Sequence, residues 1–252
     1  MTDRDRLIDR ERELEFLESS WHKPAGQLLI IMGRRRIGKT ALLRHFAHRH
    51  AIVHYMAARL PEAQQLAELG HAVGTAIGDP ILAANGFRDW NQVFTLLASG
   101  RTRLALMLDE FPYLVDANPA LPSLLQRAWD SSLAERESWI VLCGSSVAMM
   151  ERETLDARAP LFGRRTGVLR LAPLPFEAVR QFVPGYDFDD AVRTYAVFGG
   201  IPHYLRLVDP AHSLAANIRA LVLDTGAPLR DEVEFLLRQE LADTRIYFGI
   251  LA

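Results

Sequence analysis

Gly33-Arg34-Arg35-Arg36-Ile37-Gly38-Lys39-Thr40 is the stretch that decides how this chain folds. It fits the pattern G-x-x-x-x-G-K-[ST], in which two glycines let successive backbone N–H groups converge on phosphate oxygens. The preceding residues 28–32 are apolar and have the character of a buried parallel strand, and residues 41–48 follow with helical spacing. The order of strand, glycine loop and helix predicts a phosphate-binding loop, or P-loop.

The residues of this loop have distinct expected roles. Lys39 supplies a point charge for the β- and γ-phosphates, and Thr40 supplies a hydroxyl ligand for Mg²⁺. The helix that begins near Lys39 adds the positive end of its dipole. The expected nucleotide contacts are Gly33, Arg34, Arg35, Arg36, Ile37, Gly38, Lys39, Thr40 and Ala41.

Composition narrows the class of protein. The chain has 252 residues, of which 49% are hydrophobic and 24% charged, so it can form a sizeable core. A net charge of −2 gives no overall basic field for nucleic acid. Cys143 is the single cysteine, the first residues are charged, and no apolar run approaches the ~20 residues of a membrane span. We expect a cytoplasmic protein with no membrane association.

Apolar strand-like runs alternate with helical patterns as far as a break at Pro173 and Pro175, and only helical patterns follow. This predicts an α/β fold: a three-layer αβα core with a parallel sheet in residues 1–172, then an all-helical lid in residues 173–242. The predicted strands are 27–32, 52–57, 103–108, 138–143 and 167–171. The predicted helices are 39–50, 61–76, 88–99, 118–134, 146–153, 176–183, 188–197, 201–207, 211–223 and 227–242.

Two acids end the third predicted strand. Because ligands bind at the carboxyl ends of parallel strands, Asp109 is expected beside the P-loop, where it holds Mg²⁺ directly or through water. Glu110 follows it and is the candidate to orient and polarise the attacking water. Ser145 ends the next strand and either senses the γ-phosphate or holds the water, while Ser146 is the candidate N-cap of the helix that follows.

Two further sequence features suit nucleotide chemistry. Arg164 and Arg165 lie in a glycine-flanked loop before the last strand, where an arginine reaching the γ-phosphate would stabilise transition-state charge, within its own subunit or across an interface. The alternative is a pair of solvated surface arginines. Gly199-Gly200-Ile201-Pro202 opens a helix in the second domain and suits a lid element that contacts nucleotide.

Taken together, these motifs resemble the archaeal-type ATPases of the STAND group within the AAA+ class. The resemblance rests on Asp9-Arg10-Glu11-Arg12-Glu13-Leu14, on the P-loop, on residues 108–114, and on residues 199–202 with Tyr204-Leu205. It implies a switch that binds ATP or ADP with Mg²⁺ and hydrolyses ATP slowly.

The same resemblance implies roles for residues outside the P-loop. Arg10, in a module spanning residues 7–17, and Pro202 would lie near the adenine and ribose, and Arg164 would be the arginine of the family's Gly-Arg loop. Residues 243–252 would begin a winged-helix domain, so the chain looks truncated there. A DNA or protein partner reached through the missing C-terminal region and a nucleotide-dependent oligomer are further expectations.

Three other readings of the sequence remain to be weighed. A nucleotide-gated module that binds DNA or a protein with negligible catalysis would use a basic face made of Arg34, Arg35, Arg36, Arg44, His45, His48 and His50. A small-molecule kinase is disfavoured by the Asp-Glu pair and the long helical tail. A zinc site at His45, His48, His50 and His54 is disfavoured because helical spacing aligns only the first two.

Overall fold

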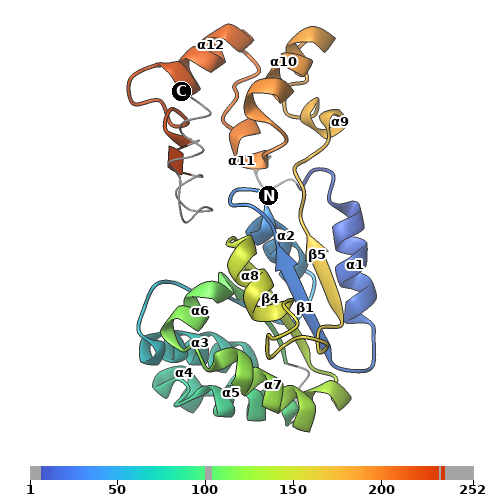
Figure 1. The fold of residues 1–252 in the computed structure, drawn as a ribbon, viewed down its shortest axis with the longest axis vertical. Helices are drawn as coiled ribbons and strands as arrows, with labels where there is room; N and C mark the ends of the chain where they lie inside the picture. Colours follow the sequence, from blue (N-terminus) through green and yellow to red (C-terminus); the bar gives the residue numbers. More distant parts are fainter. Residues whose placement is uncertain (1–6, 100–103, 233, 236–252) are drawn as a thin grey trace. The chain divides into compact units, whose positions relative to one another are not determined.

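The computed structural model describes residues 7–99, 104–232 and 234–235 (Figure 1). Its central element is a sheet of parallel strands, which confirms the predicted fold class. The strands are β1 (Gln27–Met32), β2 (Ile52–Met56), β3 (Ala105–Asp109), β4 (Trp139–Gly144) and β5 (Gly167–Arg170). Each lies within a few residues of its predicted span, because the apolar β-branched runs that predict these strands are also the ones the core buries.

The strand order is β2-β3-β4-β1-β5. β4 therefore separates β1, which leads into the P-loop, from β3, which ends in Asp109. The register pairs Met32 with Gly144 and Leu108 with Leu142, so all three strands end at one edge of the sheet. This order places the residue after β4 between the P-loop strand and the acidic strand end.

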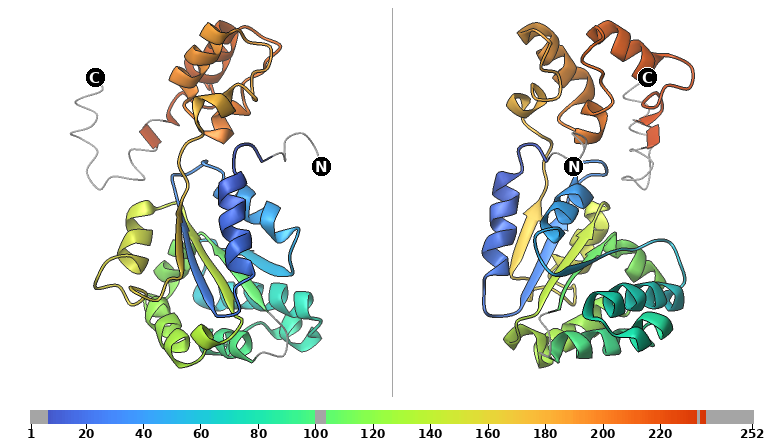
Figure 2. Two further views of the ribbon diagram at one scale, coloured as in Figure 1. Left: turned by 90° about the vertical axis from the view of Figure 1, so that its right-hand side faces the viewer. Right: turned by 180° about the vertical axis from the view of Figure 1, so that it is seen from behind.

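Helices pack on both faces of the sheet. The even-numbered residues Leu28, Ile30 and Met32 of β1 belong to a buried cluster with the helices between β2 and β5. On the other face, the Trp139 ring of β4 stacks on Phe46 at 5.6 Å and donates its Nε1–H to Ser20 Oγ at 3.1 Å. Since strand side chains alternate between faces, the fully buried strands give the αβα layering seen in Figure 2.

Most core helices lie where the hydrophobic periodicity predicts them. These are α2 (Lys39–Ala47), α3 (Glu62–Ile77), α5 (Trp90–Ala98), α7 (Leu121–Ser131), a short 3-10 helix (Leu133–Glu135) and α8 (Val147–Thr154). Three helices were not predicted: α1 (Glu11–Trp21), α4 (Pro80–Asn85) and α6 (Phe111–Ala117). The first begins at Arg10 with no side-chain cap, and the other two are too short to show a clear period.

The chain forms two compact units. One consists of Arg10–Gly33 and Lys39–Arg170, and the other of Met1–Asp9, Arg34–Gly38 and Leu171–Ala252. The described part of the second unit beyond residue 171 is helical. It contains α9 (Phe176–Val179), α10 (Phe188–Phe198), α11 (Pro202–Leu205), α12 (Leu214–Ile218) and a π-helical turn (Arg219–Leu223). Half of the predicted helix 227–242 and all of the predicted winged-helix start, residues 243–252, lie outside the described residues. Of the described half, residues 228–231 form turns rather than the predicted helix.

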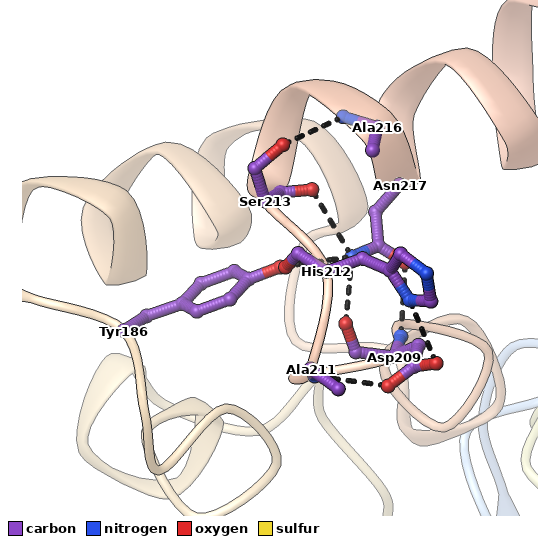
Figure 3. Close-up of polar contacts among 7 residues, drawn as sticks. All are labelled: Tyr186, Asp209, Ala211, His212, Ser213, Ala216 and Asn217. Atoms are coloured by element: carbon purple, nitrogen blue, oxygen red, sulfur yellow. Dashed lines mark hydrogen bonds and ion pairs between the residues drawn. The ribbon is translucent and has the colours of Figure 1, made fainter.

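A buried asparagine organises the turn between α11 and α12 (Figure 3). The Asn217 side chain donates to the Tyr186 hydroxyl and to the Asp209 carbonyl, each at 2.8 Å, and accepts from the Asp209 N–H at 2.9 Å. Tyr186 in turn donates to the carbonyl of His212 at 2.7 Å. These bonds satisfy both the donor and the acceptor of the buried Asn217 amide and tie the loop to α12.

None of the helices within the described ranges combines the length and the apolar character that a bilayer crossing requires.

We predict that Gly70→Ala destabilises the fold. Alanine normally favours a helix interior by about 1 kcal/mol over glycine. At Gly70 in α3, however, a Cβ would lie 2.4 Å from the Cα of Gly86, which is backbone and cannot move aside cheaply. We expect a loss of about 2 kcal/mol in the free energy of unfolding, measured by urea denaturation.

The matched control is Gly185→Ala, where the nearest atom to an added Cβ is 3.9 Å away. That variant should stay within about 0.5 kcal/mol of the parent chain. A Gly70→Ala protein as stable as the parent would show that α3 and α4 do not pack this closely.

Candidate active site

The P-loop follows β1 and runs into the first turn of α2. Arg36 and Gly38 have φ values of 66° and 101°, in the left-handed region. Such reversals are what a nest of inward-facing N–H groups requires. The buried Lys39 ammonium donates to the Gly33 carbonyl at 2.7 Å, so the two ends of the loop are tied together.

Asp109 is the most enclosed acid of the site, with 1% of its surface exposed. Its Oδ2 accepts the hydroxyl hydrogen of Thr40 at 2.7 Å and lies 3.4 Å from His54 Nε2. Its Oδ1 accepts the backbone N–H of Glu110 at 3.0 Å. The carboxylate therefore joins the start of α2 to the end of β3, across the intervening strand β4.

Burial alone would raise the pKa of Asp109, because a low-dielectric surrounding disfavours the charged form. Hydrogen bonds from His54, Thr40 and the Cys143 thiol outweigh this, and the pKa of Asp109 lies below its ordinary value. The Cys143 thiol has its pKa raised well above the usual range, first by burial and then by Asp109. Asp109 is thus an anion and Cys143 a neutral donor at neutral pH.

Glu110 adopts a left-handed backbone conformation, with φ 55° and ψ 42°. Its Oε1 accepts the hydroxyl hydrogen of Ser145 at 2.7 Å, and its Oε2 lies 3.4 Å from the Ser145 backbone N–H. Ser146, the next residue, caps α8 by accepting from the Met149 N–H. Of the two serines after β4, Ser145 therefore holds Glu110, and Ser146 begins helix α8.

The structure places Arg164 away from the P-loop of its own chain. Its guanidinium makes a two-pronged contact with the Asp130 carboxylate, at 2.8 Å from both Nε and Nη2. Thr166, two residues later, bonds to Leu28 at the beginning of β1. The five residue steps from Leu28 to Gly33 span roughly 16 Å, which exceeds the reach of an arginine side chain. A contact with nucleotide across a subunit interface stays a prediction.

The other expected nucleotide contacts lie in different units, and their roles also stay predictions. Arg10 is buried at the start of α1 and pairs with Glu13 at 2.8 Å. Pro202 begins α11 in the helical unit. Arg34 and Arg35 are exposed, whereas Arg36 is partly buried and pairs with Glu232.

The four histidines of the zinc hypothesis have other neighbours in the structure. Within the described residues, no group of three or more His, Cys, Asp or Glu side chains is arranged to hold a metal ion. His50 bonds to Glu18 at 3.0 Å and packs on Trp21 and Phe46, while His54 faces Asp109. His50 is enclosed in this way, and Arg36 is ion-paired with Glu232. These two residues therefore contribute little to the basic face that a DNA- or protein-binding module would use.

Sequence reasoning missed His54 and Cys143 as partners of Asp109. Both lie on strands that directly neighbour β3, and His54 is paired in register with Met107, two residues before the acid. A polar residue inside an otherwise apolar strand was the available signal. Its partner is set by strand order, which the sequence does not display.

Comparisons with known proteins identify the family of the chain. A model of the family described as "ATPase domain predominantly from Archaea" matches residues 7–208. An uncharacterized protein of Methanocaldococcus jannaschii is 31% identical over 245 residues, covering 97% of this chain and 53% of its own length. The chain therefore spans about half of that relative. An uncharacterized ATP-binding protein of the same organism is 48% identical over 40 residues, which are 16% of this chain and 68% of that protein.

Solved structures show the same fold. A Walker-type ATPase of Pyrococcus abyssi superposes with a TM-score of 0.65 at 20% identity, over 92% of this chain and 76% of its own. A STAND protein of Pyrococcus horikoshii with a tetratricopeptide repeat sensor gives a TM-score of 0.56 at 17% identity, over 80% of this chain and 29% of its own. The resemblance to archaeal-type P-loop ATPases, read from the motifs, is thus confirmed.

We predict that the backbone of Glu110 stores measurable strain. Glu110→Ala and Glu110→Gly both remove the contact with Ser145, so their difference isolates the left-handed backbone. Glycine should be more stable than alanine here by about 1 kcal/mol in urea denaturation.

The control pair is Asp116→Ala and Asp116→Gly, at an exposed position inside helix α6. There the order should reverse, with alanine more stable by about 1 kcal/mol. If alanine were more stable than glycine at position 110 as well, the backbone of Glu110 would be unstrained.

Proposed function

This chain belongs to the family of ATPase domains found predominantly in Archaea, and from that premise we propose that it binds ATP with Mg²⁺ and hydrolyses it slowly, as a nucleotide-controlled switch. The observation that carries the proposal is the 2.7 Å bond between Thr40 and Asp109, beside a Glu110 held by Ser145. A hydroxyl and an ionised carboxylate meet there at the carboxyl edge of a parallel sheet.

The donor set fits the ion. Mg²⁺ prefers oxygen ligands and keeps part of its water shell, and Thr40 and Asp109 offer one hydroxyl and one carboxylate with a lowered pKa. Mg²⁺ bound there would neutralise charge on the phosphate oxygens. Lys39, already tied to Gly33, would hold the phosphates at the mouth of the loop.

Glu110 is assigned the proton-accepting role. Both carboxylate oxygens contact Ser145, Oε1 through the hydroxyl at 2.7 Å and Oε2 through the backbone N–H at 3.4 Å. Because the second contact is the longer one, we assign Oε2 as the oxygen that takes the proton of the attacking water. Ser145 acts as a positioning residue, because its hydroxyl fixes the plane of the carboxylate. Slow turnover is expected, since both oxygens of the base already contact Ser145 and its backbone is held in a left-handed conformation.

We propose that Arg164 acts on nucleotide only across an interface between subunits. Arg164 lies at the amino-terminal side of β5 and is bound by Asp130, so a role toward nucleotide requires a neighbouring copy of the chain. A nucleotide-dependent oligomer would supply that neighbour. A DNA or protein partner of the longer relatives is likewise a proposal, because this chain spans 53% of the Methanocaldococcus protein.

We predict that Glu110→Gln binds ATP with an affinity close to that of the parent chain and loses hydrolysis by roughly 100-fold or more, because the amide cannot accept the proton. Binding is measured by calorimetry, and phosphate release is followed with Mg²⁺ present. Lys39→Ala should lose both binding and turnover, since the phosphates lose their cation.

Glu135→Gln is the matched control, an exposed glutamate in the short 3-10 helix that precedes β4. It should hydrolyse ATP like the parent. Equal turnover in Glu110→Gln and the parent would remove Glu110 as the base. Absence of ATP binding in the parent would remove the proposed function itself.

A further inference from the structure

The third arginine of the P-loop is held by two residues that lie far along the chain. Arg36 Nη1 forms an ion pair with Glu232 Oε2. The Tyr204 hydroxyl donates to Glu232 Oε1 at 2.7 Å, and the Arg36 guanidinium lies over the Tyr204 ring, 5.8 Å from its centre. All three residues belong to the same compact unit, which includes Arg34–Gly38 and Leu171–Ala252.

The glycine-proline motif explains how Tyr204 reaches the loop. Gly200 accepts the Leu174 N–H at 2.7 Å, and a Cβ on Gly200 would lie 1.9 Å from the Leu174 carbonyl oxygen, so only glycine fits. Pro202 then begins α11, and its Cγ is 3.8 Å from where a Cβ of Gly38 would stand. The motif thus sets α11 against the P-loop segment, which brings Tyr204 next to Arg36.

The contact between Arg36 and Glu232 is largely shielded from solvent, so its loss is expected to have a large energetic effect. About 10% of the Glu232 side chain and 33% of the Arg36 side chain are exposed. A buried carboxylate that loses its cation is strongly destabilised, because neither water nor another charge replaces the lost interaction. The pKa of Tyr204 is raised to about 12, first by burial and then by Glu232, so its hydroxyl stays a donor to that carboxylate.

Arg36 also belongs to the loop that, in the proposed function, receives the phosphates of a nucleotide. It is the residue with φ 66° in the loop whose backbone is expected to cradle phosphate, two positions before Gly38. Glu232 is therefore an anion bound to the same cationic loop that must receive another anion. Two anions that share one cation at close range oppose each other's binding.

We propose that Glu232 is an internal competitor for the P-loop, whose carboxylate holds Arg36 until the phosphates of a nucleotide displace it. The inference rests on the proposed function only in requiring that the loop binds a nucleotide. Displacement leaves Glu232 without its cation, so the segment from Asp224 to Glu232 loosens when nucleotide binds. Nucleotide occupancy is thereby reported to this segment of the helical unit.

Thermodynamic linkage between the Arg36–Glu232 pair and nucleotide binding fixes the direction in which nucleotide affinity must change. If nucleotide weakens the Arg36–Glu232 pair, then loss of the pair must strengthen nucleotide binding by the same factor. Glu232→Gln removes the charge and keeps the shape of the side chain. Its dissociation constant for ATP with Mg²⁺ should fall about 5-fold or more, as measured by calorimetry.

Two variants control that measurement. Asp231→Asn makes the same charge change at the adjacent exposed residue and should stay within about 2-fold of the parent. Tyr204→Phe keeps the ring over Arg36 and removes only the hydroxyl that holds Glu232. It should tighten binding in the same direction by a smaller factor, and it provides the test if Glu232→Gln fails to fold.

A second readout reports the loosened segment. Trypsin should cleave after Arg230 faster in the parent chain when ATP and Mg²⁺ are added, whereas Glu232→Gln should be cleaved readily without them. Binding by Glu232→Gln that is no tighter than in Asp231→Asn, or protection of Arg230 by ATP, overturns the competitor role. A parent chain that binds no ATP overturns the proposed function instead, so the two failures are distinguishable.

Discussion

The bond from the Thr40 hydroxyl to Asp109 is the interaction on which the rest of the site depends. It joins the helix after the P-loop to a strand that is not its neighbour, since β4 lies between β1 and β3. Asp109 is nearly inaccessible, and its charge persists because Thr40, His54, Cys143 and the Glu110 N–H surround it with donors. The strand order thus sets the geometry of the candidate site: it places Ser145 between the P-loop strand and the acidic strand end, where it bonds to Glu110.

The parts of the site that are local in sequence could be predicted. The P-loop, Asp109 and Glu110 each follow directly from an apolar strand, and parallel strands bring their carboxyl ends to one edge. The same rule bears on Arg164, because a residue that precedes a parallel strand lies at the opposite edge. The structure shows this, because Arg164 bonds to Asp130 while Thr166, two residues later, bonds to Leu28 at the start of β1.

What could not be predicted depends on pairings between distant segments. His54 reaches Asp109 through the register of β2 and β3, and Glu232 reaches Arg36 through the close packing around Gly200. Neither pairing leaves a local pattern. Helix α1 was also missed, because a charged segment that starts without a side-chain cap looks like a loop or a binding module. In each case tertiary contacts, rather than propensity, decide the outcome.

The most direct test of the central claim is the Mg²⁺ dependence of ATP affinity in the parent chain and in Asp109→Asn, measured by calorimetry. Asparagine keeps an oxygen that can accept from Thr40 but carries no charge for the ion. The account predicts that Mg²⁺ strengthens ATP binding to the parent and has little effect on Asp109→Asn. An unchanged Mg²⁺ dependence in Asp109→Asn would contradict the assignment of Thr40 and Asp109 as the metal end of the site.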